Sequence, residues 1–169
     1  MKNLIRKIAL VSLLLCVALS AKSQIYLGGN IGLAISSGSD ARLGVIIAPE
    51  IGYSFHSNFT VGASISYRSL QNSFGITPYL RGTLFTIQDF FSVFLSAQTP
   101  CRFTSGYQSL GAYIRPGVSF RVAPGIWLMA HIGAFGYSGT HYDGYWSGGW
   151  VAKVNSDTVN IGVCFNIGA

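Results

Sequence analysis

The chain is poor in charged residues, and most of its excess charge sits at one end. Asp, Glu, Lys and Arg make up only 9% of the sequence, whereas hydrophobic residues make up 50%. The first 23 residues hold four of the eleven basic residues and none of the five acids. The remainder therefore carries a net charge of +2 instead of +6, and Lys153 is its single lysine. A soluble domain exposes far more charge, and a nucleic-acid-binding protein needs a concentrated basic patch, so neither class fits.

Long apolar runs and metal-ligand patterns are also missing. Beyond residue 23 no uninterrupted apolar run reaches the roughly 18 residues of a transmembrane helix. The histidines and cysteines lack zinc-ligand spacing, and no phosphate loop or nucleophile elbow occurs. We therefore expect no cofactor, no bound metal and no enzymatic activity. Cys101 and Cys164 fall at different depths of the expected fold, and we expect two unpaired thiols.

The N-terminal segment has the features of a secretory signal peptide. Three basic residues precede an apolar segment of twelve residues, which is too short to span a bilayer as a stable helix. Ala21 and Ser23 satisfy the small-x-small rule for cleavage before Gln24, and cleavage after Ala21 is the alternative. We expect a signal peptide at 1–23 and one domain at 24–169.

The chain does contain repeated segments in which apolar and polar residues alternate. Apolar residues occupy every second position in runs of about ten, separated by short polar breaks, and a period of two indicates a strand with two different faces. Eight runs are expected, at 25–35, 42–55, 59–69, 76–87, 90–103, 108–122, 126–137 and in a last segment that ends the chain. Many ten-residue strands behind a secretory signal predict an all-β fold, an eight-stranded antiparallel up-and-down transmembrane β-barrel.

The breaks between the runs differ in length. Short turns are predicted near residues 57, 88 and 124, and the longest break is a Gly- and aromatic-rich loop at 138–150. Such barrels have short periplasmic turns and longer extracellular loops. Aromatic residues in an extracellular loop could stack on sugars or dock a protein partner, or could belong to an aromatic belt at the headgroup level. The candidate recognition residues are His141, Tyr142, Tyr145, Trp146 and Trp150.

Alternation alone does not separate a lipid-facing apolar exterior from the apolar core of a soluble, lipocalin-like barrel. The composition of the polar face distinguishes these two arrangements, because this face is rich in small polar residues and carries a few isolated charges. That composition suits a narrow interior filled by side chains, and arginine suits buried pairing. The charged residues are Glu50, Arg68, Arg81, Arg115 and Arg121. We interpret them as an ion-pair plug of the lumen, and a selectivity or gating cluster in a narrow pore is the alternative.

Two segments carry a family resemblance: 113–137, which begins Y-I-R-P-G-V-S-F-R-V, and the closing V-N-I-G-V-C-F-N-I-G at 159–168. They resemble the small outer-membrane barrels of the outer membrane protein X and outer membrane protein A transmembrane-domain type, and the porin-like barrel proteins of the Bacteroidetes. The resemblance implies the cell outer membrane of a Gram-negative bacterium. It implies as partners outer-membrane lipid, lipopolysaccharide and the barrel-assembly machinery, and no nucleic acid. The usual terminal aromatic residue is missing, and Phe165 is the candidate substitute.

The role expected from these features is structural, or one of surface interaction or adhesion through the 138–150 loop. A narrow porin-like channel for water or small ions is the alternative. A lipid-modifying enzyme is the third reading, because the sequence His56-Ser57-Asn58 resembles the His/Ser pair of lipid A deacylases. Ser57 and Asn58 are, however, ordinary turn residues, and we interpret this tripeptide as a turn.

Overall fold

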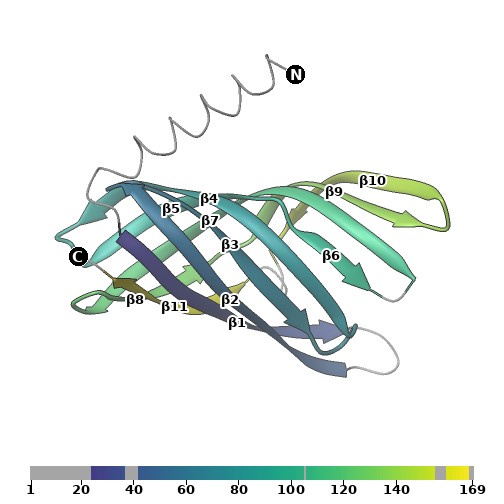
Figure 1. Cartoon of the computed structure of the whole chain (residues 1–169), viewed down its shortest axis with the longest axis horizontal. Coiled ribbons are helices and arrows are strands. Elements are labelled where there is room, and N and C mark those ends of the chain that lie inside the picture. The colour runs from purple at the N-terminus through teal and green to yellow at the C-terminus, as the bar shows by residue number, and fades with distance from the viewer. Residues whose placement is uncertain (1–23, 37–41, 105, 155–158, 168–169) are drawn as a thin grey trace, which may run out of the picture.

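A computed structural model describes residues 24–36, 42–104, 106–154 and 159–167, and the predicted signal peptide lies outside these residues. The described elements are all strands (Figure 1). They are β1 (Gln24–Ser36), β2 (Arg42–His56), β3 (Phe59–Arg68), β4 (Ser73–Ile87), β5 (Phe91–Gln98), β6 (Cys101–Thr104), β7 (Tyr107–Ala123), β8 (Ile126–His131), β9 (Ala134–Tyr142), β10 (Tyr145–Lys153) and β11 (Asn160–Ile167). Over these ranges, the chain forms no helix with the length and hydropathy of a membrane span.

The strands close into an eight-stranded antiparallel barrel, as the sequence predicts. Neighbours in the chain pair with one another from β1 to β5, then β5 pairs with β7 and β7 with β8. β8 pairs with β11 and β11 with β1, which closes the ring. β5 and β6 are two parts of one barrel strand, as are β8 and β9, and as are β10 and β11. The ring formed by β1 to β5, β7, β8 and β11 therefore has no unpaired edge strand.

The apolar side of each strand faces outward. On β1, Ile31 is 64% exposed whereas its neighbour Asn30 is 8% exposed, and the same alternation continues along the other strands. Large apolar side chains such as Leu43, Ile76 and Ile114 lie on the exterior. A lipocalin-like barrel would hold these residues in its core, so the structure contradicts that alternative and confirms a polar interior.

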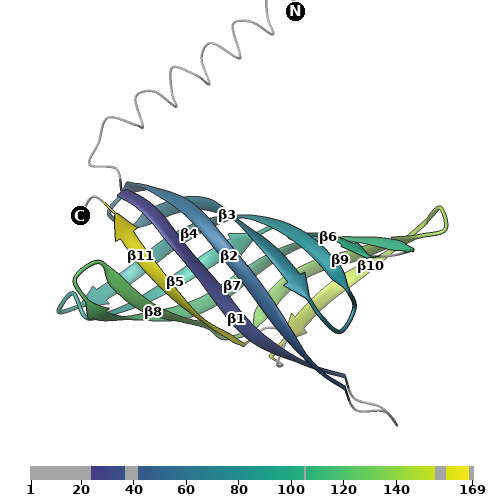
Figure 2. The same cartoon turned by 60° about the horizontal axis from the view of Figure 1, so that its bottom comes forward.

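The short turns gather at the end of the barrel where the described chain begins and ends (Figure 2). They lie at Ser57–Asn58, at 88–90 and at Pro124–Gly125. Gly125 has a φ of 73°, a left-handed conformation that glycine adopts without a steric penalty. The predicted short turns are thus confirmed, and they share one end of the barrel.

The predicted loop at 138–150 is wrong, because these residues form a β-hairpin. β9 and β10 pair in continuous register from Tyr142↔Tyr145 to Ala134↔Lys153. The turn between them consists of Asp143 and Gly144, both with positive φ (46° and 82°). Asp-Gly is a strong signal for such a two-residue turn, and the surrounding glycines hid the alternation that would have revealed it.

The predicted strand at 126–137 divides at Ile132–Gly133, beside Pro116 of β7. Proline has no N–H with which to continue the pairing. The register changes by one residue there, from Gly117↔His131 to Ile114↔Phe135. Gly133 adopts a φ of 81° at this step, which is typical of a β-bulge. Beyond the bulge β9 stays paired with β7 as far as Tyr107↔Tyr142, and the tip of the β9–β10 hairpin reaches beyond the other strands (Figures 1 and 2).

Candidate functional site

The centre of the lumen is occupied by the side chain of Arg81 from β4. Its guanidinium lies 3.4 Å from a carboxylate oxygen of Glu50 (Nη2 to Oε1), and both side chains are nearly completely buried. It also donates from Nε to Ser96 Oγ at 3.4 Å and contacts Met129 Sδ from Nη1 at 3.3 Å. The predicted ion pair therefore exists, and it joins β2 and β4, which are separated by β3.

Three aromatic rings enclose this guanidinium. Its central carbon lies 5.0 Å from the ring centroids of Tyr26, Tyr79 and Phe94, which is within the range of cation–π attraction. The Tyr26 hydroxyl donates a hydrogen bond to Glu50. The rings exclude water from the pair and strengthen its electrostatic attraction. The sequence did not single out these rings, although their positions in the strand alternation place them on the inner face.

Glycines on neighbouring strands make room for the rings. A Cβ atom at Gly62 would lie 2.6 Å from Tyr79 Cζ, and one at Gly117 would lie 2.4 Å from Phe94 Cζ. Each glycine is the register partner of the ring that crosses it. The glycines on the inner face therefore determine where the rings that enclose the Arg81–Glu50 pair lie, and these rings and this pair together form the plug of the lumen.

The plug separates two cavities in the lumen. The turn-side cavity has a volume of about 730 Å³ and is lined by Arg81, Phe94 and Trp127, among other residues. The hairpin-side cavity has a volume of about 190 Å³ and is lined by Glu50, among other residues. Of the described residues, none lines both cavities. The Arg81–Glu50 pair is thus part of the partition between the two ends of the barrel.

The predicted charge cluster is only partly assembled. Arg68 and Arg115 line the hairpin-side cavity. Arg121 does not reach the cluster, because it lies exposed at the end of β7 where a register shift to Ala123 precedes the turn. Arg102 and Lys153 also line the hairpin-side cavity and were missed. Arg102 shares the inner-face parity of its expected strand, whereas Lys153 lay outside the expected strands.

Histidine and cysteine are the remaining residue types with catalytic or metal-binding chemistry. His131 is buried and packs edge-on against Phe94, with ring centroids 5.2 Å apart. Both described cysteines are free, with Cys164 buried and Cys101 half-buried, as expected. Within the described ranges, no three His, Cys, Asp or Glu residues are grouped to hold a metal ion.

The His56-Ser57-Asn58 tripeptide forms the predicted turn. His56 is the last residue of β2, and its Nδ1 atom lies 3.3 Å from Ser57 Oγ. The backbone N–H of Asn58 donates to the same nitrogen at 3.3 Å. All three side chains are exposed, so the imidazole stabilises the turn itself.

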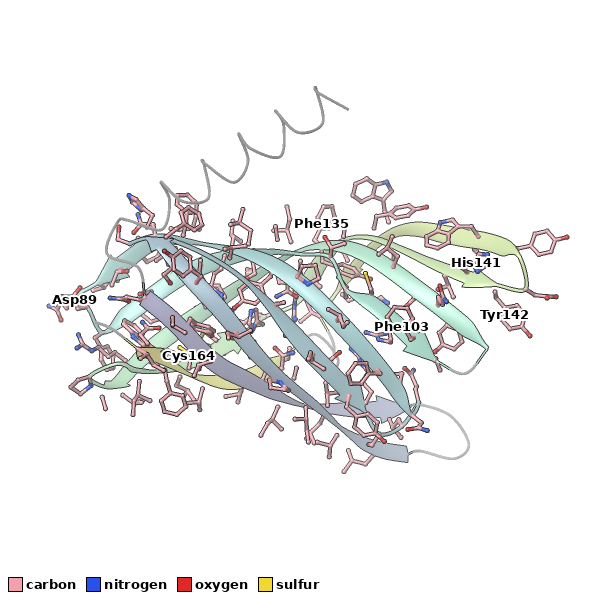
Figure 3. All side chains as sticks on the ribbon, in the orientation of Figure 1. Asp89, Phe103, Phe135, His141, Tyr142 and Cys164 are labelled. Atoms are coloured by element: carbon pink, nitrogen blue, oxygen red, sulfur yellow. The ribbon has the colours of Figure 1, made fainter. Side chains whose placement is uncertain are left out.

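The candidate recognition residues lie on the hairpin instead of in a loop. All five are exposed, and His141 and Tyr142 lie at the end of the barrel opposite Asp89 (Figure 3). His141, Trp146 and Trp150 share the outer face, and Tyr142 and Tyr145 share the other. On the outer face, His141 packs near Trp146 with ring centroids 6.4 Å apart. The outer face of the hairpin is therefore covered by aromatic rings.

Aromatic residues of the hairpin pack on one another and on its glycines. Trp150 stacks on Phe135 and meets Tyr137 edge-on, at centroid distances of 6.0 and 6.1 Å. The indole of Trp146 covers Gly139, where a Cβ atom would come within 2.3 Å of it. Aromatic rings laid over strand glycines restore packing that glycine lacks.

Comparison with known proteins supports the fold. Searches of family models and of curated proteins found no match. Among solved structures, the chain is similar to Neisserial surface protein A (NspA), with a TM-score of 0.50 and 16% sequence identity over 86% of this chain and 97% of that one. The chain thus shares its barrel fold with NspA. At this identity the likeness concerns the fold alone.

Proposed function

We propose that this chain is an outer-membrane protein with a sealed lumen, whose role is structural or one of surface interaction through the β9–β10 hairpin. The apolar exterior supports a lipid environment, in which a closed barrel satisfies its backbone hydrogen bonds internally. The barrel fold and the signal-like N-terminal segment support the outer membrane. Outer-membrane lipid and lipopolysaccharide would contact the exterior, and the barrel-assembly machinery would insert the chain.

The observation that carries the proposal is the plug. Arg81 makes an ion pair with Glu50 and is held among three aromatic rings, with a cavity on either side. A solute would have to displace this group of buried side chains to cross the barrel. With the lumen blocked, the exterior and the exposed hairpin are the surfaces left for interaction.

Conductance in a planar lipid bilayer tests the sealed lumen. We expect the wild-type barrel to insert without a steady current, and Arg81→Ala to give measurable current because it removes the centre of the plug. A steady wild-type current well above leak would contradict the proposal and favour the narrow channel for water or small ions. Altered electrophoretic mobility of unboiled samples would show that each protein entered the bilayer as a folded barrel.

Labelling of intact cells tests which end of the barrel reaches the surface. In a Cys101→Ser background, Tyr145→Cys places a thiol on the hairpin, where the native side chain is 81% exposed. Ser57→Cys is the matched variant at the other end of the barrel. We expect a membrane-impermeant maleimide to label Tyr145→Cys and not Ser57→Cys. The reverse pattern would contradict a surface role for the hairpin.

A further inference from the structure

The turn-side cavity is large enough to hold a ligand. Its volume of about 730 Å³ lies within the roughly 300–1,000 Å³ that is typical of small-molecule sites. The hairpin-side cavity, at about 190 Å³, is smaller than that. Tyr26, Arg81 and Phe94 of the plug line the inner end of the turn-side cavity, and Ser57 and Asp89 place its mouth among the short turns. The cavity is therefore a dead-end site and not a passage across the barrel.

Hydroxyl groups line one side of this cavity. They belong to β2, β3, β4, β5 and β7, which follow one another around the ring. Ser54 Oγ lies 2.8 Å from Thr60 Oγ1, and Thr86 Oγ1 lies 2.9 Å from Ser92 Oγ, each across a pair of register partners. A hydroxyl has one proton and two lone pairs, so each bonded pair keeps one proton and several acceptor sites for a ligand. The residues of this hydroxyl wall are Ser54, Thr60, Thr83, Thr86, Ser92 and Ser119.

The other side of the cavity, formed by β8, β11 and β1, carries an aromatic surface. Trp127 of β8 lines the cavity and packs against the buried cluster that contains Phe94, Met129 and Cys164. β8 and β3 are four strands apart in both directions around the ring, so the indole and Thr60 belong to opposite walls. The cavity therefore places a flat apolar ring across from a row of hydroxyl groups.

The charges of the cavity do not favour an ionic ligand. Arg81 at the inner end is paired with Glu50 and enclosed by rings. Of the described residues of the lining, Asp89 is the other one with a full charge, and it is exposed at the mouth, as is His56. A buried ionic ligand would lack a counter-charge, which is costly. The lining suits a neutral ligand that combines many hydroxyl groups with an apolar face.

We propose that the turn-side cavity binds a neutral sugar, with one face of a pyranose ring against Trp127 and its hydroxyl groups toward the hydroxyl wall. A pyranose has this combination, because its C–H groups form an apolar face and its hydroxyl groups lie around the edge of the ring. An aromatic ring provides a large rigid contact surface for such a face, and paired hydroxyl groups supply the directed hydrogen bonds. The site is additional to the exterior and the hairpin.

The sugar has two possible sources, a free disaccharide or the end of a longer glycan. Both present the same ring chemistry to the cavity. Because the inner end is closed by the plug, the cavity admits a chain end and no internal segment of a polymer.

Titration of the refolded full-length barrel, in a detergent without a sugar headgroup, tests the proposal. The probes are maltose, cellobiose and N,N′-diacetylchitobiose, and sorbitol is the control that carries hydroxyl groups without a ring. The chain has three tryptophans, so the indole N–H signals in a nuclear magnetic resonance spectrum report on the site directly. We expect at least one disaccharide to shift the Trp127 signal and leave those of Trp146 and Trp150 in place, with sorbitol shifting none.

Matched variants locate the site on one side of the plug. Thr83→Val/Ser119→Ala removes two hydroxyl groups from the turn-side cavity and should weaken binding about tenfold. Ser64→Ala/Thr77→Val makes the same two changes in the lining of the hairpin-side cavity and should bind as the wild type does. Trp127→Leu should weaken binding at least tenfold, because the ring contact is lost, whereas Trp146→Leu on the hairpin should have no effect.

A second arm separates the two sources of sugar. The linear tetrasaccharide of the same linkage is compared with the disaccharide that binds best. Equal or tighter binding of the tetrasaccharide assigns the site to the end of a glycan, whose remaining rings extend through the mouth. Exclusion of the tetrasaccharide assigns the site to a free disaccharide.

Three results would overturn the proposal. In the first, none of the three disaccharides shifts the Trp127 signal more than sorbitol does, a measurement that needs no variant. In the second, Ser64→Ala/Thr77→Val weakens binding as much as Thr83→Val/Ser119→Ala. In the third, the signals of Trp146 or Trp150 shift in place of that of Trp127, which would assign the sugar to the hairpin. If Trp127→Leu loses its heat-dependent gel mobility and is thus unfolded, the two hydroxyl variants decide.

Discussion

The centre of the lumen and the β9–β10 hairpin contain similar residues, but these residues are buried in the lumen and exposed on the hairpin. Both contain aromatic rings laid over strand glycines. In the lumen, Tyr79 crosses Gly62 and is 4% exposed, whereas on the hairpin Trp150 is 75% exposed. The first set lies inside a ring of eight paired strands, and the second lies on a hairpin that is paired with β7 through β9 and has β10 at its edge. The environment, more than the residue type, decides whether an aromatic ring seals the barrel or is offered to the surroundings.

The same contrast concerns charge. Arg81 is surrounded by rings and paired with Glu50, while Arg121 lies exposed at the end of β7. A buried ion pair offers little net stabilisation relative to an apolar pair, but breaking it leaves an uncompensated charge. Stability should therefore respond to substitutions in the plug far more than to substitutions at the ends of the barrel or on the hairpin.

The largest expected effect is that of Arg81→Ala. It would leave the Glu50 carboxylate buried without its counter-charge, and we expect a loss of about 3–5 kcal/mol in the free energy of unfolding. Arg121→Ala should change it by less than about 0.5 kcal/mol. Urea unfolding in lipid vesicles, followed by gel mobility and tryptophan fluorescence, measures both. Equal losses would show that the plug is not a distinct stabilising centre.

Removing both charges of the plug should cost less than removing one. In Glu50→Gln/Arg81→Met, the amide keeps one oxygen that can accept the Tyr26 hydrogen bond, and the thioether fills part of the space of the guanidinium. We expect this double variant to be more stable than Arg81→Ala, because no buried charge remains unpaired. A double-mutant cycle with the two single variants measures the coupling. Additive effects would mean that the two charges do not interact.

Glycine substitutions compare packing in the two regions. At Gly62 a Cβ atom would lie 2.5 Å from the carbonyl oxygen of Ile51 and 2.6 Å from the ring of Tyr79, whereas at Gly149 it would meet nothing within 4 Å. We expect Gly62→Ala to lose about 1–3 kcal/mol by overpacking and Gly149→Ala to lose none. Thermal unfolding monitored by circular dichroism measures both variants. A destabilised Gly149→Ala would indicate that the hairpin is packed against another part of the chain.

The smallest global effect is expected at the tip of the hairpin. Gly144 has a φ of 82°, and Gly144→Ala would place a Cβ atom in a conformation that costs roughly 1–2 kcal/mol. The strain should loosen the β9–β10 pairing and leave the closed ring intact. Hydrogen exchange should accelerate at amides of Ala134–Tyr142 and Tyr145–Lys153 and stay unchanged in β1 to β4. Faster exchange throughout the barrel would show that hairpin and ring unfold together.

The sequence was sufficient for the strand pattern because alternation and turn chemistry are local. The runs at 25–35, 42–55 and 59–69 correspond to β1, β2 and β3 within one or two residues, and the short turns lie where they were expected. It failed at 138–150, where glycines at positions 139, 148 and 149 interrupt the apolar alternation although the backbone remains extended. The Asp143–Gly144 turn was the local signal that could have corrected this.

The site was predictable in part. Parity placed Glu50, Arg68, Arg81 and Arg115 on the inner face, and the structure brings the first and third together. The alternation gives the face of a strand but not the position of a residue along the barrel axis, so Arg121 was grouped with residues that lie far from it. Nor does it show which rings enclose a guanidinium, because Tyr26, Tyr79 and Phe94 come from three different strands.

By itself the sequence determined the eight strands, the antiparallel up-and-down order and the choice of an apolar exterior. These follow from a period of two, from turn residues and from the poverty of charge. Only the tertiary structure decided that Arg81 pairs with Glu50, that the lumen divides into two cavities, and that four cationic side chains share one of them. Those features depend on the register and tilt of strands distant in the sequence, and closure of the ring fixes both.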